Sequence, residues 1–219
     1  VDRRHPTATV ARILGQKEEV NPKYALCANG AMYRKDIHGF LPEIMQKIYD
    51  ERVQSKKLML MAKQAYEKTP TKELEKSISK YNNIQMARKI QLNSAYGAIG
   101  NQYFRYYNLR NAEAITMSGQ VSIRWIEHKM NKFLNKTLKT EGEDYVIASD
   151  TDSIYLNLGP LVETVYKGRE KTSKSVVSFL NKVCELELEK YIEGSYKELA
   201  TYVNACLLYT SPSPRDLSE

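Results

Sequence analysis

Apolar residues recur at helical spacing through the first half of the chain. The stripe that starts at Leu41 predicts a helix over residues 42–68, with Pro42 at its first position. Thr69-Pro70-Thr71 interrupts this pattern, and its second threonine can cap another helix over residues 72–98. Two long helices joined by so short a link predict an antiparallel helical hairpin, with each helix about 40 Å long.

Helical periodicity returns after an aromatic, irregular stretch over residues 97–110. It predicts a third long helix over residues 111–138, a short helix over residues 162–166, and one or two helices over residues 175–203. The third helix should bury its apolar positions, which are Ile115, Val121, Ile123, Trp125, Ile126, Met130 and Phe133.

Short β-prone runs predict two hairpins outside these helices. Residues 24–28 and 31–33 flank Asn29-Gly30, a strong signal for a tight turn. Residues 145–149 and 153–158 flank a second, acidic break. The pattern therefore predicts an α+β fold: a long antiparallel helical hairpin attached to a body with a small antiparallel β-sheet and packing helices.

The acidic break, Asp150-Thr151-Asp152, puts two carboxylates at the tip of the second hairpin. Neighbouring like charges disfavour ionisation of both groups, and a bound cation removes that penalty. Carboxylate oxygens are hard ligands that suit Mg²⁺. The alternative is an ordinary turn, because Asp is a good turn former and such tripeptides are common.

Composition narrows the class of protein without deciding it. Lys and Arg outnumber Asp and Glu by 33 to 26, and the net charge of +7 favours an acidic partner such as nucleic acid. Sixteen tyrosines suit stacking on bases, although they also suit an ordinary core. Three widely separated cysteines fit neither a disulfide framework nor a zinc site, which indicates a reducing, intracellular setting. Every apolar run is far shorter than the ~20 residues of a membrane span.

One face of the second predicted helix carries several chemically distinct groups. On a helical wheel Asn93, Tyr96 and Gly97 fall on the same half as Lys89, beside an apolar stripe that can face protein. An ammonium binds phosphate as a point charge, and a ring next to a glycine lets a base pair pack against the helix. The alternative is a solvated lysine and a core tyrosine.

The first predicted helix has a cationic face of its own. Arg52 and Lys56 are four residues apart and therefore share a face, with Lys63 further along it. They continue an apolar stripe, which suggests that the packed base of the helix gives way to a pocket wall. The alternative is that the helix leaves the body there and these side chains meet water. In an antiparallel hairpin this pair can converge with Lys89, and three cations suit a triphosphate.

Two of these stretches resemble motifs of the family B DNA polymerases. Lys89-Ile-Gln-Leu-Asn-Ser-Ala-Tyr-Gly97 is similar to the Lys-x-x-x-Asn-Ser-x-Tyr-Gly motif of that family, and Asp150-Thr-Asp-Ser153 is similar to its second catalytic aspartate motif. Gly39-Phe-Leu-Pro42 also fits the start of the family's fingers. Several motifs in the same order are far more specific than any one of them.

Further stretches resemble the replicative polymerases of T-even-type tailed bacteriophages, namely Tyr103–Ala112 and Ala114–Gln120. The resemblance spans roughly residues 20–204. It implies a DNA-directed DNA polymerase fragment made of fingers and part of the palm. The implied domains are a partial palm over residues 1–40, the fingers hairpin over residues 41–100, and the palm with the acidic hairpin over residues 101–204.

The remaining residues, 205–219, look non-native and disordered, because Ser-Pro repeats oppose regular structure. Cys206–Asp216 resembles a translated sequencing-adapter read-through, so we assign no function to it.

The resemblance also implies roles for individual residues. The nucleotide-binding residues are Arg52, Lys56, Lys89, Asn93, Ser94, Tyr96 and Gly97, of which the last two line the minor-groove side of the nascent base pair. Asn101 and Tyr103 contact the template. The metal ligands and catalytic carboxylates are Asp150 and Asp152, and Lys89 takes part in catalysis.

The implied mechanism is two-metal nucleotidyl transfer from a dNTP to a primer 3′-hydroxyl. One Mg²⁺ lowers the pKa of that hydroxyl, and the other neutralises the triphosphate and the leaving pyrophosphate. Asp152 bridges both ions, Asp150 is the weaker or more distant partner, and Lys89 stabilises or protonates the leaving group. The implied partners are primer–template DNA, dNTP and a sliding clamp, with no membrane, in the host cytoplasm if the protein is phage-encoded.

Departures from the family pattern bear on activity. Ser149 stands where the family usually has Gly, and the 219 residues contain no Asp-x-x-Ser-Leu-Tyr-Pro-like run, which is the family's first catalytic motif. That motif carries the other metal-bridging Asp, and the exonuclease and thumb are missing as well. The chain also begins abruptly without Met, so we expect that it opens inside a larger protein and that the isolated chain is inactive.

Two other hypotheses compete with a polymerase fragment. One is a non-catalytic nucleic-acid- or nucleotide-binding helical module that kept the basic helices. The other is a structural helical protein with a fortuitous acidic hairpin, which predicts no change in helix protection when a triphosphate and Mg²⁺ are added.

Overall fold

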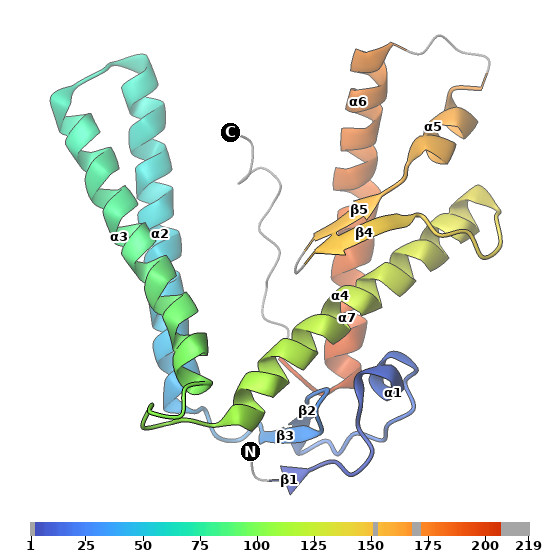
Figure 1. The fold of residues 1–219 in the computed structure, drawn as a ribbon. Coiled ribbons are helices and arrows are strands. Elements are labelled where there is room, and N and C mark those ends of the chain that lie inside the picture. Colours follow the sequence, from blue (N-terminus) through green and yellow to red (C-terminus); the bar gives the residue numbers. More distant parts are fainter. Residues whose placement is uncertain (1–2, 151–152, 168–171, 207–219) are drawn as a thin grey trace. The chain divides into compact units, whose positions relative to one another are not determined.

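The computed structural model describes residues 3–150, 153–167 and 172–206. The chain forms two compact units, Lys35–Ala112 and a larger one that joins Val1–Arg34 to Glu113–Glu219. Long helices dominate, and two small antiparallel sheets accompany them (Figure 1). The predicted α+β class is therefore confirmed.

The smaller unit is a helical hairpin. Its helices, α2 (Phe40–Lys68) and α3 (Lys72–Ile99), are antiparallel and lie side by side (Figure 1). The hydroxyl oxygen of Thr71 accepts a hydrogen bond from the backbone N–H of Leu74 at 3.3 Å, so this threonine caps α3 as predicted. The hairpin and its link thus follow the sequence pattern closely.

The start of α2 differs from the prediction by two residues. The helix begins at Phe40, after the extended N-cap residue Gly39, and so Pro42 is its third residue. Proline is tolerated there because the N–H groups of the first helical turn have no acceptor within the helix.

The seam between the two helices is filled by a mixture of apolar and polar side chains. Its buried residues include Ser55, Met59 and Ala62 of α2 and Gln85 of α3. The hydroxyl of Ser55 donates to the backbone oxygen of Glu51 at 2.8 Å, which satisfies that buried polar group.

The aromatic stretch after α3 packs against the beginning of α2. The rings of Phe40 and Tyr106 lie 4.9 Å apart between centroids, and those of Phe104 and Tyr106 lie 5.8 Å apart. The backbone N–H of Asn108 donates to the oxygen of Ile99 at 3.1 Å. These contacts tie residues 100–108 to the base of the hairpin.

The larger unit begins with a three-stranded antiparallel sheet in the order β1-β3-β2. The strands are β1 (Arg3–Arg4), β2 (Tyr24–Leu26) and β3 (Ala31–Arg34), with helix α1 (Val10–Leu14) between the first two. Gly30 has a φ of 81°, which a side chain would strain, and this explains the Asn-Gly turn that the sequence predicts.

Helices make up most of the rest of this unit. They are α4 (Leu109–Leu138, in this unit from Glu113), α5 (Gly159–Val165), α6 (Ser173–Val183), a π-helical turn (Cys184–Leu188) and α7 (Glu189–Tyr202). The last three follow one another without a break, so the predicted helical segment over residues 175–203 is one continuous run. The π-turn within it was not predicted, because a single turn with one more residue than an α-helical turn barely changes the spacing of apolar residues.

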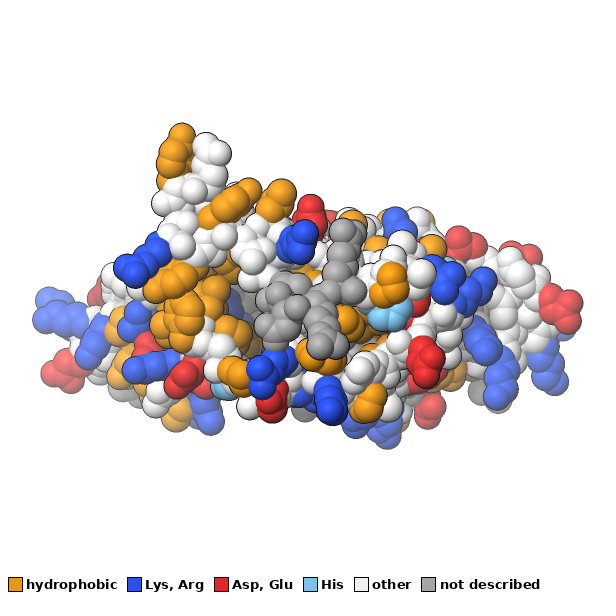
Figure 2. All heavy atoms as spheres, turned by 90° about the horizontal axis from the view of Figure 1, so that it is seen from below, with side chains coloured by type: hydrophobic (Ala, Val, Ile, Leu, Met, Phe, Trp, Pro, Cys, Tyr) orange, Lys and Arg blue, Asp and Glu red, His pale blue; other side chains and the backbone are white. Residues whose placement is uncertain are grey.

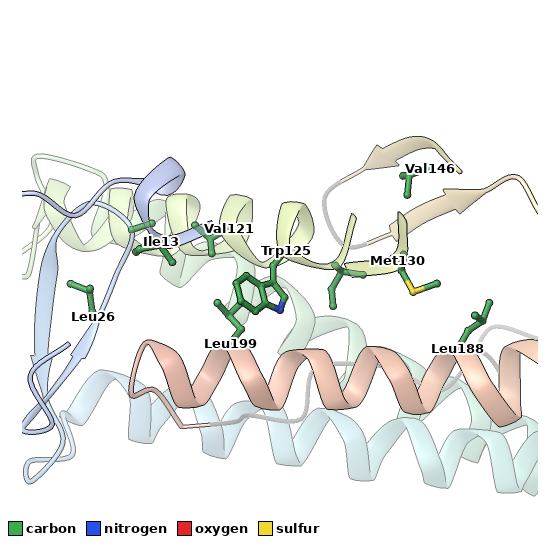
Figure 3. Packing of buried hydrophobic residues seen from close by; sticks show 10 residues of the cluster. Ile13, Leu26, Val121, Trp125, Met130, Val146, Leu188 and Leu199 are labelled. Atoms are coloured by element: carbon green, nitrogen blue, oxygen red, sulfur yellow. The ribbon is translucent and has the colours of Figure 1, made fainter. Parts of the chain in front are cut away.

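The core of the larger unit lies between α4, α7 and the two sheets. Met130 and Leu134 of α4 are almost completely buried, and Figure 3 shows Trp125 pointing from α4 toward Leu199 of α7. Four of the seven predicted core positions are buried, namely Val121, Trp125, Ile126 and Met130, while Ile123 and Phe133 are half-buried. The prediction for Ile115 is wrong: it is 52% exposed although the adjacent Ala114 is buried, so at this level of α4 only the face of Ala114 is covered.

Polar contacts join α4 to α7. The indole N–H of Trp125 donates to the backbone oxygen of Ser195 at 2.9 Å. The ammonium of Lys129 lies 4.7 Å from the centre of the Trp125 ring and 2.6 Å from Oε1 of Glu198. The hydrogen bond from Lys129 lowers the pKa of Glu198 by more than burial raises it.

A second polar cluster fixes the N-terminal segment. Burial raises the pKa of Glu18, but hydrogen bonds from Arg12 and Thr7 and the nearby charges of Arg12 and His5 lower it below its ordinary value. The hydroxyl of Tyr202, at the end of α7, accepts a hydrogen bond from the backbone N–H of Glu18 at 2.9 Å. Glu18 therefore attaches the segment that follows α1 to the last helix.

Candidate nucleotide and metal site

The acidic hairpin has the form that the sequence predicts. Strands β4 (Val146–Asp150) and β5 (Ser153–Leu156) are antiparallel, and Asp150 pairs with Ser153 at the end of the ladder. Asp150 is exposed, and its backbone oxygen accepts a hydrogen bond from the hydroxyl of Ser153 at 3.1 Å. The other two residues of the predicted motif, Thr151 and Asp152, lie outside the described residues.

Ser149, which stands at the position of the glycine in the motif that the hairpin resembles, lies inside this ladder. Ser149 pairs with Ile154, one step before Asp150, so the substitution is accommodated in regular strand geometry. Any L-residue adopts such a conformation, whereas a positive φ would have favoured glycine.

The chemistry of the hairpin suits a hard cation, and Asp150 is the carboxylate of the pair that lies among the described residues. The residues that the structure describes contain no group of three or more His, Cys, Asp or Glu side chains that could hold a metal ion. Because Asp152 is not among them, this finding leaves the predicted Asp150–Asp152 pair untested.

The predicted nucleotide-binding face of α3 is open to solvent. Its residues are all exposed, namely Lys89, Asn93, Ser94, Tyr96 and Gly97. The neighbouring apolar stripe is turned inward, with Leu92 and Ala95 half-buried and Ile99 buried. A methyl group built at Gly97 would meet no described atom within 4 Å, so the face is open beside the Tyr96 ring.

The cations of α2 are less exposed than those of α3. Arg52 and Lys56 are both half-buried. The Nε atom of Arg52 is buried and has no hydrogen-bond partner among the described residues. A buried donor of this kind is normally satisfied, so the Arg52 guanidinium is suited to an anionic ligand.

An ion pair that the sequence analysis missed joins the two helices. Nε of Arg88 on α3 lies 2.8 Å from Oε2 of Glu51 on α2. Because residue 51 is opposite residue 88 in antiparallel helices, Arg52 and Lys89 are offset by only about 3 Å along the hairpin. Lys56 lies about one turn further toward the hairpin tip.

The helical wheel puts the cations on one flank of the seam. Measured from the buried stripes of the two helices, Arg52, Lys56 and Lys89 all fall on the same side, and Glu51 falls on the other. The helical wheel thus agrees with the predicted convergence of these three cations, which stays a prediction. Glu51 is paired with Arg88.

The two predicted template contacts lie in the stretch that follows α3. Tyr103 is 87% exposed, which leaves its ring available for stacking. The side-chain oxygen of Asn101 accepts a hydrogen bond from the backbone N–H of Tyr103 at 3.0 Å, so Asn101 shapes this turn whatever else it contacts.

Comparison with known proteins supplies the family. The family model described as DNA polymerase family B matches residues 8–199. This chain belongs to the family B DNA polymerases. The match includes both the Lys89 motif on α3 and the acidic hairpin of β4 and β5.

Among its relatives, this family B chain is similar to two phage proteins described as DNA-directed DNA polymerases. It is 34% identical to that of Enterobacteria phage T4, over 88% of this chain and 26% of the phage protein. It is 31% identical to that of Escherichia phage RB69, over 85% of this chain and 25% of the phage protein. A DNA polymerase of Thermococcus gorgonarius is 28% identical over 77% of this chain and 19% of its own length. The chain thus spans about a quarter of the length of the phage relatives.

The surface is mixed in character. Figure 2 shows one face of the molecule, on which Lys and Arg side chains are interspersed with acidic and hydrophobic ones. In the part of the chain that the structure describes, no helix has the length and apolar character needed to cross a membrane.

Proposed function

We propose that this chain supplies the fingers and part of the palm of a DNA-directed DNA polymerase. The observation that carries the proposal is the family match over residues 8–199, which spans both sets of predicted site residues. In this assignment residues 1–40 and 101–204 belong to the palm and residues 41–100 form the fingers. The reaction is transfer of a nucleotide from a dNTP to a primer 3′-hydroxyl.

The cationic flank of the hairpin binds the triphosphate. Arg52, Lys56 and Lys89 provide the positive charge, and Asn93 and Ser94 lie next to it on the exposed side of α3. The unsatisfied Nε of Arg52 supports this role, because a phosphate oxygen would complete its hydrogen bonding. Closure of the hairpin over the nucleotide aligns the reactants and excludes water.

The open surface at the end of α3 accepts the nascent base pair. Tyr96 offers a flat ring, and Gly97 leaves space beside it, as the absence of any described atom near a built methyl group supports. Asn101 and Tyr103 contact the template strand, for which the exposed Tyr103 ring is suited.

The acidic hairpin provides the catalytic carboxylates. Asp150 and Asp152 carry hard oxygen donors two residues apart at a turn, a donor set that suits Mg²⁺. Two bound Mg²⁺ ions would lower the pKa of the primer 3′-hydroxyl and neutralise charge on the triphosphate and pyrophosphate. Asp152 is the principal ligand and Asp150 the weaker one, while the Lys89 ammonium stabilises or protonates the leaving group.

The proposal includes partners that the chain would meet as part of a polymerase. These are primer–template DNA, dNTP and a sliding clamp. The 219 residues lack the first catalytic motif, so we propose that the chain alone does not extend a primer.

The test measures binding of a fluorescent dNTP to the purified chain by anisotropy, with and without Mg²⁺. Lys89→Ala should raise Kd about 10- to 150-fold, because a hydrogen bond to a charged group contributes about 1.5–3 kcal/mol. Asp152→Asn should remove the Mg²⁺ dependence. If Asp152→Asn left Mg²⁺-dependent binding unchanged, the alternative of a non-catalytic nucleotide-binding module would be favoured.

Primer extension is the second measurement. The isolated chain should add no nucleotide to a primer–template in the presence of Mg²⁺ and all four dNTPs. Template-directed synthesis by this chain would show that the missing motif is dispensable and would overturn the proposed division of catalytic residues.

A further inference from the structure

The Glu51–Arg88 ion pair crosses the hairpin seam beside the proposed triphosphate site. Its two members directly precede Arg52 and Lys89 in the sequence. The interaction is 2.8 Å long, and each side chain retains a little over a third of its exposure. Nη1 of Arg88 also donates to Oε1 of Gln91 at 2.8 Å, which orients the guanidinium.

Several of the buried side chains in the seam are small or flexible. They include the small side chains of Ser55 and Ala62 and the flexible side chain of Met59. Ser55 bonds to its own helix, and Gln85 likewise bonds to Asn82 of α3 at 3.0 Å. Small and flexible residues tolerate sliding of one helix along the other better than interlocked large ones.

We propose that Glu51 and Arg88 are positioning residues that hold Arg52 and Lys89 at the spacing required by one triphosphate. A slip of the helices by one residue would displace these cations by about 1.5 Å relative to each other. Misplacement on that scale weakens binding even though no phosphate contact has been removed. This inference rests on the proposed function, since it assumes that the two cations share a phosphate ligand.

The substitution Glu51→Gln separates positioning from simple electrostatics by the sign of its effect. It removes a negative charge near the proposed site, so electrostatics alone predicts tighter binding of an anionic triphosphate. Loss of the ion pair predicts weaker binding, with Kd raised about two- to fivefold, the range expected for a partly exposed pair. The probe is the same fluorescent dNTP with Mg²⁺, at low and at high salt, because screening should shrink the difference.

A charge swap tests whether the pair acts as a unit. Each of Glu51→Arg and Arg88→Glu should weaken binding, and the double variant should bring Kd back toward the wild-type value. The matched control is Glu67→Gln, an exposed glutamate about 24 Å further along α2, which should leave Kd unchanged.

The outcomes distinguish this inference from the function on which it rests. If the wild-type chain binds no dNTP, or if Lys89→Ala binds as tightly as the wild type, the proposed function fails and the positioning role fails with it. If Lys89→Ala weakens binding but Glu51→Gln tightens it or leaves it unchanged, the site stands and the positioning role is overturned. Weaker binding by Glu51→Gln together with rescue by the charge swap supports it.

Discussion

Individual buried side chains contribute measurably to the free energy of unfolding of the larger unit. Met130 of α4 has no exposed surface and belongs to the core cluster. Met130→Ala should therefore lower the free energy of unfolding by about 2–5 kcal/mol, through lost burial and the cavity left behind. Urea denaturation followed by circular dichroism measures it. The control Met117→Ala, at a position of α4 that is 36% exposed, should cost much less, and equal costs would contradict the burial argument.

The thiols of the described cysteines should differ in reactivity. Burial raises the pKa of Cys27 more than a hydrogen bond with Ser118 lowers it, whereas Cys206 is exposed. The thiolate is the reactive form, so at pH 8 Cys206 should react with N-ethylmaleimide well before Cys27. Peptide mass spectrometry of a time course gives both rates. Faster labelling of Cys27 would show that its segment is not packed in solution.

At the scale of whole elements, the sequence predicted most of what the structure contains. The long helices, the Asn-Gly hairpin and the acidic hairpin all followed from periodicity and turn residues, because each is specified by local sequence. What failed depends on packing. Ile115 continues the apolar pattern of α4 and is exposed although the adjacent Ala114 is buried, because a periodic pattern does not say how wide the buried stripe is at each level of a helix.

The candidate site was predictable to a similar extent. The residues on α3 and the acidic hairpin were found because they form recognisable motifs. Glu51 and Arg88 were missed because neither belongs to a motif and their pairing depends on the register of two helices. A signal was nevertheless present: both residues lie about equally far from the Thr-Pro-Thr link, so counting outward from that link places them opposite each other.

The capping threonine of α3 provides a prediction for the hairpin as an element. Thr71→Ala removes the acceptor for the N–H of Leu74 and should cost about 1 kcal/mol. The loss should appear as faster amide hydrogen exchange in the first turn of α3. Thr69→Ala, two residues earlier, is the matched control, because the described structure shows no hydrogen bond of that side chain. Equal exchange in the two variants would mean that the cap does not hold this end.

On the scale of the whole molecule, the two units differ in how many of their side chains are buried. The hairpin unit exposes most of its predicted site residues, while the larger unit contains the core cluster. Contacts such as Glu18 with Tyr202 and Lys129 with Glu198 join segments that are 184 and 69 residues apart. Global unfolding should therefore report mainly on the larger unit, and nucleotide binding on the hairpin.

The Lys129–Glu198 contact makes the stability of the larger unit depend on pH. The folded pKa of Glu198 is lowered below its ordinary value of 4.5, chiefly by the hydrogen bond from Lys129. Such a carboxylate stabilises the fold fully above its unfolded pKa, and this contribution disappears as the pH falls through the lower, folded pKa. Glu198→Gln should therefore reduce stability at pH 7 by at most about 1 kcal/mol, since the pair is partly exposed, and by less at pH 3. Thermal denaturation at the two pH values measures the difference.

The control is Glu187→Gln, at an exposed residue for which the described structure shows no ion pair. This substitution should shift Tm little at either pH. A Glu198→Gln effect of the same size at pH 3 as at pH 7 would mean that the charge of Glu198 does not stabilise the packing of α4 against α7.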